Sequence, residues 1–191
     1  MVGRRCGNHP FVWKRWSQII KRYTDTELSD ELKKMTIIID SNEKVYDHIE
    51  KYFQKNSIPH KVRKLETGDY TAMIGDMTLE NDVVIERKAS IDEVCSNLAS
   101  NDRLRFEREM IRAKAHGIKV FWLIENATWS DIFIGNYRSK ASRQSVIASI
   151  LTFTARYNLT LIFCKPEETP RLICGILYYF AREELKYGDK R

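Results

Sequence analysis

The residues of this 191-residue sequence best suited to chemistry are two acids and a lysine: Asp69, Glu86 and Lys88. Glu86 and Lys88 are one residue apart and follow the apolar run 83–85, which is typical of a buried strand. Side chains alternate along a strand, so Glu86 and Lys88 are expected on the same face. Asp69 follows Gly68 at the start of an earlier strand. A buried acid beside a buried base is costly unless something compensates the charges.

A divalent cation held by Asp69 and Glu86 would supply that compensation. Hard cations such as Mg²⁺ choose carboxylate oxygens and keep water molecules for chemistry, and oxygen ligands favour Mg²⁺ or Mn²⁺ over Zn²⁺. The simpler alternative is an ordinary salt bridge between Glu86 and Lys88, with Asp69 as a turn residue. Two further acids are close to a strand end, since Asp40 ends an apolar run and Glu43 follows three residues later.

The segments around these residues alternate between strand and helix patterns, which predicts an α/β domain. Apolar or alternating runs predict strands at 36–40, 60–66, 70–74, 82–88, 118–125 and 159–164. Helical spacing and end signals predict helices at 41–54, 90–98, 103–116, 140–157 and 170–186. Ser41 is the expected cap of the first helix, and Gly75-Asp76 the turn of a hairpin.

The positive charge of the chain comes from its N-terminus. The chain has 32 basic and 26 acidic residues, a net charge of +6. Residues 1–22 contain six of the basic residues and no acid, so the remainder is neutral. Lys14 and Arg15 lie opposite an apolar stripe at helical spacing, which predicts a basic amphipathic helix able to meet DNA, an anionic membrane or a partner. The alternative is a helix that packs on the main domain.

We therefore divide the chain into a basic helical arm, 1–34, and a domain, 35–191. Met35 directly precedes the first strand and is an alternative start. No apolar run reaches the roughly 18 residues that span a bilayer, and no secretory signal is recognisable. The four cysteines are scattered, which favours a reducing compartment. A cytoplasmic location is expected, in the nucleoid or host cytoplasm for a prokaryotic or phage protein and in the nucleus for a eukaryotic one.

Two separated segments carry a resemblance to a known family. Residues 68–70, Gly-Asp-Tyr, and residues 86–92, Glu-Arg-Lys-Ala-Ser-Ile-Asp, resemble GD…ERKxxxD, the signature of XPF-type structure-specific endonucleases in the PD-(D/E)XK group. Three further segments agree in order: Ile37–Glu43 resembles the opening VDxRE, Asn101–Phe106 the stretch after the motif, and Ile118–Asn126 the next strand. The resemblance covers about residues 36–186. It implies a restriction-endonuclease-like core, with a central mixed β-sheet flanked by helices.

The sequence departs from the family pattern at three points. Asn42 stands where the family has an arginine, and sixteen residues, 70–85, separate Asp69 from Glu86. The tandem helix-hairpin-helix domain that many members carry is not found after the nuclease region. Neither of the first two departures removes an expected metal ligand.

The resemblance implies a role for each motif residue. Asp69 and Glu86 would hold Mg²⁺, for which Mn²⁺ substitutes, and the backbone carbonyl of Arg87 would add a third oxygen. Lys88 would orient the attacking water and offset phosphate charge. Asp40 and Glu43 would hold a second metal or its waters.

The Arg87 side chain is expected on the opposite face from Glu86. There it either pairs with Asp92 as support, which we favour, or contacts a phosphate. Asp92 is alternatively an acid stabilised by the N-terminus of a helix.

Basic and apolar helix faces suggest the partners. Four arginines are placed to track a DNA backbone: Arg103, Arg105, Arg108 and Arg112. The alternative is a solvated face paired with Glu107 and Glu109. The C-terminal helix has an apolar face made by Ile173, Ile176, Leu177 and Phe180. This face either belongs to the core or pairs two chains in a homodimer or heterodimer, as the resemblance implies.

The predicted function is therefore a metal-dependent DNA endonuclease. It would hydrolyse phosphodiester bonds in branched or junction DNA, such as flaps and forks, in repair, recombination or replication. One alternative is a catalytically silent module for DNA binding or dimerisation within a nuclease complex. Another is a four-way-junction or sequence-specific nuclease built on the same core.

Overall fold

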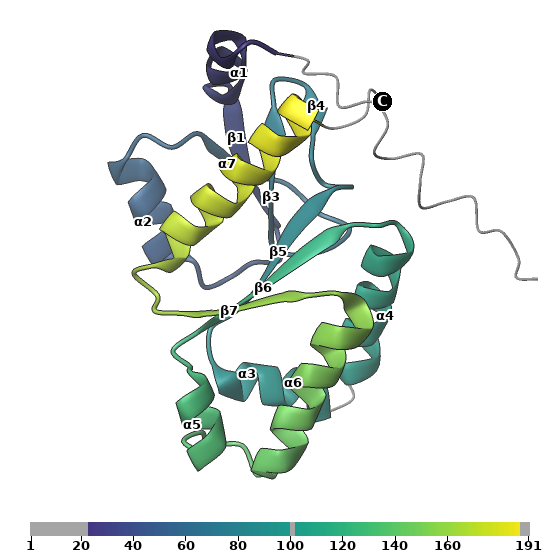
Figure 1. Ribbon diagram of the computed structural model, residues 1–191. Helices are drawn as coiled ribbons and strands as arrows, with labels where there is room; N and C mark the ends of the chain where they lie inside the picture. Colours follow the sequence, from purple (N-terminus) through teal and green to yellow (C-terminus); the bar gives the residue numbers. More distant parts are fainter. Residues whose placement is uncertain (1–22, 100–101, 188–191) are drawn as a thin grey trace, which may run out of the picture.

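The structure, a computed structural model, describes residues 23–99 and 102–187. The basic helix predicted near the N-terminus, with Lys14 and Arg15, lies outside these residues. The described residues form three layers, with one mixed sheet between two layers of helices (Figure 1). The predicted α/β architecture, a mixed sheet flanked by helices, is confirmed.

Within the described ranges, seven strands form one sheet: β1 (Met35–Ile39), β2 (His60–Val62), β3 (Tyr70–Ile74), β4 (Met77–Thr78), β5 (Val83–Lys88), β6 (Lys119–Glu125) and β7 (Thr160–Cys164). Their order is β2-β1-β3-β5-β6-β7, and β4 pairs with β3. Strand β3 runs antiparallel to its neighbours β1 and β5, whereas β5, β6 and β7 are parallel. Every residue of β5 is buried, because helices cover both faces of this central strand.

The helices divide between the two faces (Figure 1). One face is covered by α1 (Asp25–Leu32), α2 (Asp47–Lys55) and α7 (Thr169–Tyr187). The other is covered by α3 (Ile91–Ala99), α4 (Asp102–Ala115), α5 (Trp129–Ile134) and α6 (Arg143–Tyr157). Each face has its own apolar core: Ile39, Phe53 and Leu177 are in the first, and Trp122 and Phe153 are in the second.

The start of α2 differs from the prediction. Helix α2 begins at Asp47, and its N-cap residue Tyr46 makes no side-chain capping bond, so the predicted cap at Ser41 is wrong. Glu43 lies in the turn after β1 instead of in a helix, and its N–H donates to the carbonyl of Asp40 at 3.0 Å. This turn carries the chain from the C-terminal end of β1 to the α2 layer.

Two short helices were not predicted. Helix α5 has only six residues, too few for a periodic pattern, and is defined by the Thr128 cap and by Gly135 at φ +76°. Helix α1 begins with a capping box at Thr24, and its buried Leu28 and Leu32 join the core beside α7. Residues 25–32, the end of the segment predicted to be helical, therefore pack against the main domain.

Helix α7 uses its apolar face inside the molecule. Ile173 and Leu177 are fully buried, and Ile176 and Phe180 pack against the same core. Ile173 and Leu177 are thus core residues, whereas Ile176 and Phe180 are only half-buried, and pairing of two chains through this face stays a prediction. Among the described residues, no helix is long and apolar enough to cross a membrane.

Two glycines shape the approach to β3 and its hairpin. Gly75, at φ +56°, forms the predicted turn between β3 and β4. Gly68, at φ +72°, precedes β3 where the chain passes close to β5. A Cβ atom at Gly68 would lie 2.8 Å from Cβ of Val84 and 3.2 Å from the carbonyl oxygen of Ile85. Only glycine fits there, because both the dihedral angle and the space exclude a side chain.

Replacing Gly68 by alanine is expected to destabilise the protein more than replacing Gly117. Gly117 has a similar φ, +73°, but a Cβ there would meet nothing within 4 Å. Both variants pay about 1–2 kcal/mol for a left-handed alanine. Gly68→Ala should lose a further 1–3 kcal/mol, roughly the cost of overpacking. Urea unfolding of the two variants checks this, and equal losses would contradict the close approach.

Candidate active site

Asp69, Glu86 and Lys88 meet at one end of the sheet, between β3 and β5. Asp69 is fixed by its backbone, because its N–H donates to the carbonyl of Ile85 at 2.8 Å and its carbonyl accepts the N–H of Asp40 at 2.7 Å. Its Oδ2 accepts the backbone N–H of Arg87 at 2.7 Å. These three bonds tie Asp69 to the ends of β1 and β5.

Glu86 and Lys88 form a buried ion pair. The Nζ atom of Lys88 lies 2.5 Å from Oε1 of Glu86, which confirms that the two side chains share a face of β5. Lys88 is also 3.6 Å from Glu93 of α3 and 5.5 Å above the ring of Phe106 of α4. The lysine is held between the sheet and the helices of this face.

Burial and charge shift the ionisation of all three groups. Burial and the nearby Glu86 carboxylate hold the pKa of Asp69 well above its ordinary value. Burial also raises the pKa of Glu86, against the opposing effect of Lys88. For Lys88, burial favours the neutral amine, but Glu86 and Asp69 outweigh it and raise the lysine pKa. Lys88 is therefore protonated at neutral pH in the metal-free protein.

The paired carboxylates fit a hard divalent cation. Each is made unstable as an anion by burial and by its acidic neighbours, and a cation between them would relieve that cost. Within the described residues, no group of three or more His, Cys, Asp or Glu side chains is arranged to hold a metal. Two carboxylates suit Mg²⁺, which keeps several waters and is usually bound by one or two carboxylates together with substrate phosphates.

Arg87 belongs to a second cluster on the opposite face of β5. Its Nε and Nη2 atoms donate to Glu125 at 2.9 and 2.8 Å, and Nη1 donates to Glu43 at 2.7 Å. The side chain is only 4% exposed. The predicted pairing of Arg87 with Asp92 is therefore wrong. The Arg87 guanidinium faces Glu125 and Glu43 inside the protein, away from any phosphate at the surface. Asp92 instead accepts backbone N–H groups of Arg138 and Ser139 at 2.8 and 3.0 Å.

Asp40 and Glu43 both have protein partners. Oδ1 of Asp40 accepts the N–H of Leu65 at 2.9 Å and lies 3.3 Å from Nζ of Lys64, so this acid anchors the loop that leads to Gly68. Glu43 is bound by Arg87, and burial raises its pKa. A role for these two acids at a second metal stays a prediction.

Three further acids shape the site, and the sequence analysis assigned none of them a role there. Glu125 binds Arg87 and lies 3.0 Å from Nε2 of His48. Glu109 of α4 accepts the N–H of Gly68 at 2.9 Å, and Glu93 accepts the N–H of Ala89 at 2.8 Å. Glu125 ends an apolar strand as Asp40 does, and that pattern is the signal that would have found it. Glu109 has no such signal, because its partner is 41 residues away.

The predicted DNA-binding arginines differ in availability. Arg103 is folded back, because it donates to the carbonyl of Leu98 at 3.1 Å and lies 5.6 Å from the ring centre of Phe153. It is therefore not placed for phosphate binding. Three others are exposed on α4: Arg105, Arg108 and Arg112.

The alternative in which these arginines pair with the acids of α4 is wrong. Glu107 accepts hydrogen bonds from Arg156 at 2.7 Å and from Tyr157 at 2.8 Å. Glu109 accepts the N–H of Gly68. Both acids are used within the fold, so the arginine face keeps its positive charge.

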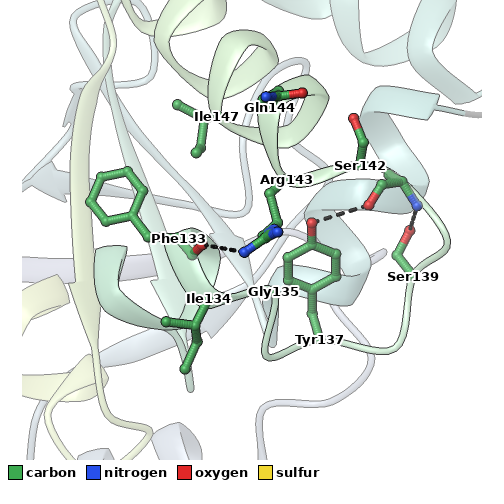
Figure 2. A pocket seen from close by; sticks show the side chains of 10 residues that line it. Phe133, Ile134, Gly135, Tyr137, Ser139, Ser142, Arg143, Gln144 and Ile147 are labelled. Carbon is green, nitrogen blue, oxygen red and sulfur yellow. Dashed lines mark hydrogen bonds between the residues drawn. The ribbon is translucent and has the colours of Figure 1, made fainter.

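A separate pocket of about 580 Å³ lies between α5 and α6 (Figure 2). Its polar groups bond locally, since Arg143 donates to the carbonyl of Phe133 at 3.4 Å and the Tyr137 hydroxyl donates to Ala141 at 3.1 Å. None of the residues predicted to perform chemistry lines it. The candidate active site is therefore the group at the sheet end and not this pocket.

Comparisons with known proteins agree with the site and the fold. The ERCC4 domain family matches residues 39–176, a span that includes Asp69, Glu86 and Lys88. The chain therefore belongs to the ERCC4 domain family, the XPF-type nucleases that the motif indicated. No curated protein matches the sequence at a significant level.

Two solved structures are similar to this chain in fold. XPF from Aeropyrum pernix has a TM-score of 0.58 at 17% identity, with 78% of this chain and 66% of that chain covered. XPF from Aeropyrum pernix in complex with DNA has a TM-score of 0.56 at 17% identity, with 78% and 65% covered. The chain thus spans slightly less than two thirds of the length of either structure, and at this identity the likeness establishes the fold alone.

Asp69→Asn is expected to stabilise the metal-free protein at neutral pH. The pKa of Asp69 is higher in the folded than in the unfolded protein. The free energy of unfolding therefore falls as the pH rises from the unfolded-state pKa to the folded-state pKa, and this loss is complete at higher pH. Asparagine removes that charge and still accepts the Arg87 N–H. The melting temperature should rise by about 2–4 °C for each kcal/mol regained, and the gain should disappear in acid.

Glu86→Gln is the contrasting variant. Its melting temperature at neutral pH should lie below that of Asp69→Asn, because the relief from burying the Glu86 charge is offset by the loss of the carboxylate nearest the buried Lys88 ammonium. Thermal unfolding of both variants between pH 4 and 8 measures the two effects. Destabilisation by Asp69→Asn at neutral pH would contradict the electrostatics derived for the site.

Proposed function

We propose that this chain is a metal-dependent DNA endonuclease that hydrolyses phosphodiester bonds in branched or junction DNA. The observation that carries the proposal is the group formed by half-buried Asp69 and the buried pair of Glu86 and Lys88, held at a sheet end within the matched ERCC4 domain. Repair, recombination and replication are the processes in which such DNA arises. Flaps and forks are the expected substrates.

Each residue of the group has a distinct task. Asp69 and Glu86 hold Mg²⁺, or Mn²⁺ in its place, and the backbone carbonyl of Arg87 is the proposed third oxygen. When bound, the cation polarises the scissile phosphate and lowers the pKa of coordinated water. Lys88 orients the attacking water and offsets phosphate charge. The Glu125–Arg87–Glu43 cluster holds β5 in register behind the site.

DNA binding is assigned to positive charge outside the carboxylate site. Arg105, Arg108 and Arg112 are exposed on α4, the helix whose Glu109 holds the loop before Asp69. Lys14 and Arg15 of the N-terminal segment would add sequence-independent phosphate contacts. The XPF from Aeropyrum pernix has been solved in complex with DNA, which supports DNA as the partner here. A second chain, as homodimer or heterodimer, would pair through α7, where Ile176 and Phe180 are only half-buried.

A cleavage assay with variant proteins tests the proposal. Labelled flap, fork, four-way-junction and continuous duplex DNA are incubated with Mg²⁺, Mn²⁺ or EDTA. Branched forms should be cut only with metal, and Asp69→Ala, Glu86→Ala and Lys88→Ala should each lower the rate by about 10²-fold or more. DNA binding by these variants should be retained, because the arginines are untouched.

Lys33→Ala is the matched control for Lys88→Ala. Lys33 is an exposed lysine that caps the C-terminus of α1 and pairs with Asp30 at 2.8 Å, so its loss should leave cleavage unchanged. Normal cleavage by Asp69→Ala or Glu86→Ala would contradict the assignment of these residues to the active site. Binding of branched DNA without cleavage under any condition would favour the silent DNA-binding module.

A further inference from the structure

Helix α4 presents an exposed stripe that mixes positive charge with large apolar side chains. The stripe consists of Leu104, Arg105, Arg108, Ile111 and Arg112, and we call it the α4 stripe. Leu104 is 64% exposed and Ile111 is 51% exposed. At 100° per residue, these five side chains fall within about one third of the helix circumference. The stripe is therefore one continuous surface.

The face of α4 opposite the α4 stripe is buried, so the stripe points away from the core. Phe106, Met110 and Ala113 pack in the core between α4 and the sheet. The α4 acids Glu107 and Glu109 are bonded within the fold, to α6 and to the Gly68 backbone. Among the described residues, no ion pair involves an arginine of the stripe. The surface offers three guanidinium groups to an anionic partner and not to a second copy of itself.

The stripe is coupled to the active site through its own helix. Glu109 holds the N–H of Gly68, next to Asp69, and the Phe106 ring lies 5.5 Å from Nζ of Lys88. Helical spacing places Arg105 and Arg112 beside Glu109, hence on the edge of the stripe nearest the site. Leu104 and Ile111 lie one step further from the site, about 10 Å apart along the helix axis. Figure 1 shows α4 on the outside of the sheet, with no other helix or strand of the described residues beside it on one side.

We propose that the α4 stripe binds DNA where base stacking is interrupted, with Leu104 and Ile111 against the exposed faces of unstacked bases. The arginines hold the adjoining phosphates. A continuous duplex offers phosphates but hides its base faces, so leucine and isoleucine gain contact area only at a branch, flap or gap. Phosphate contacts then supply affinity, and the apolar pair supplies the preference for interrupted DNA. This inference rests on the proposed function for its choice of ligand.

Binding measured in EDTA separates this inference from hydrolysis. Fluorescence anisotropy gives the Kd of the full chain for a flap DNA and for a continuous duplex of equal length. In the double variant Leu104→Ser/Ile111→Ser, the ratio of the two affinities should fall about tenfold, while the duplex Kd stays within about twofold. Arg108→Gln should instead weaken both complexes and lower the salt slope by about 0.9.

Leu151→Ser is the matched control, because Leu151 of α6 is also 51% exposed and lies outside the stripe. Its affinity ratio should equal that of the unmodified protein. An unchanged ratio in the double variant, or an equal fall in Leu151→Ser, would overturn the inference. Loss of self-association by the double variant in sedimentation, with the ratio unchanged, would assign the stripe to a second copy. A chain that cuts no DNA yet shows the expected ratios would refute the proposed function alone.

Discussion

The central strand β5 must bury three consecutive charges, and much of the structure follows from that constraint. Glu86, Arg87 and Lys88 are each less than 10% exposed. Burying an ion costs several kcal/mol unless partners of good geometry compensate it. Strand alternation sends the charges to opposite faces, so each face needs its own counter-charges. Lys88 and Glu86 neutralise one another on one face, and Glu125 and Glu43 receive Arg87 on the other.

The two faces have different consequences for function. The Arg87 cluster is saturated by hydrogen bonds that link β5, β6 and the turn after β1, so it stabilises the geometry of the sheet end. The opposite face keeps an excess of acid, because half-buried Asp69 and buried Glu86 face a single lysine. That excess disfavours the ionised carboxylates in the metal-free protein, and a divalent cation bound there, as proposed, would relieve the cost.

Sequence patterns were sufficient for the features that depend on local order. The spacing of Glu86 and Lys88 predicted a shared face, and Gly75 predicted the hairpin turn, because both depend on residues adjacent in the chain. The predicted partner of Arg87 was wrong. Its actual partner, Glu125, is 38 residues away in the sequence and is brought near only by the parallel register of β5 with β6. Helix α5 escaped prediction because six residues show no period. The contact of Glu109 with Gly68 required the packing of α4 to be known.

Metal binding by the carboxylate pair is the central claim, and calorimetry tests it directly. Mn²⁺ is titrated into the metal-free protein, into Asp69→Asn and into Asp92→Asn, an acid outside the site, in buffers of different ionisation enthalpy at mildly acidic pH. Because the pKa values of Asp69 and Glu86 are raised, binding should release protons, and the heat should vary with the buffer. Asp69→Asn should bind at least about tenfold more weakly, and Asp92→Asn should bind normally. Equal affinity in all three proteins would contradict the account.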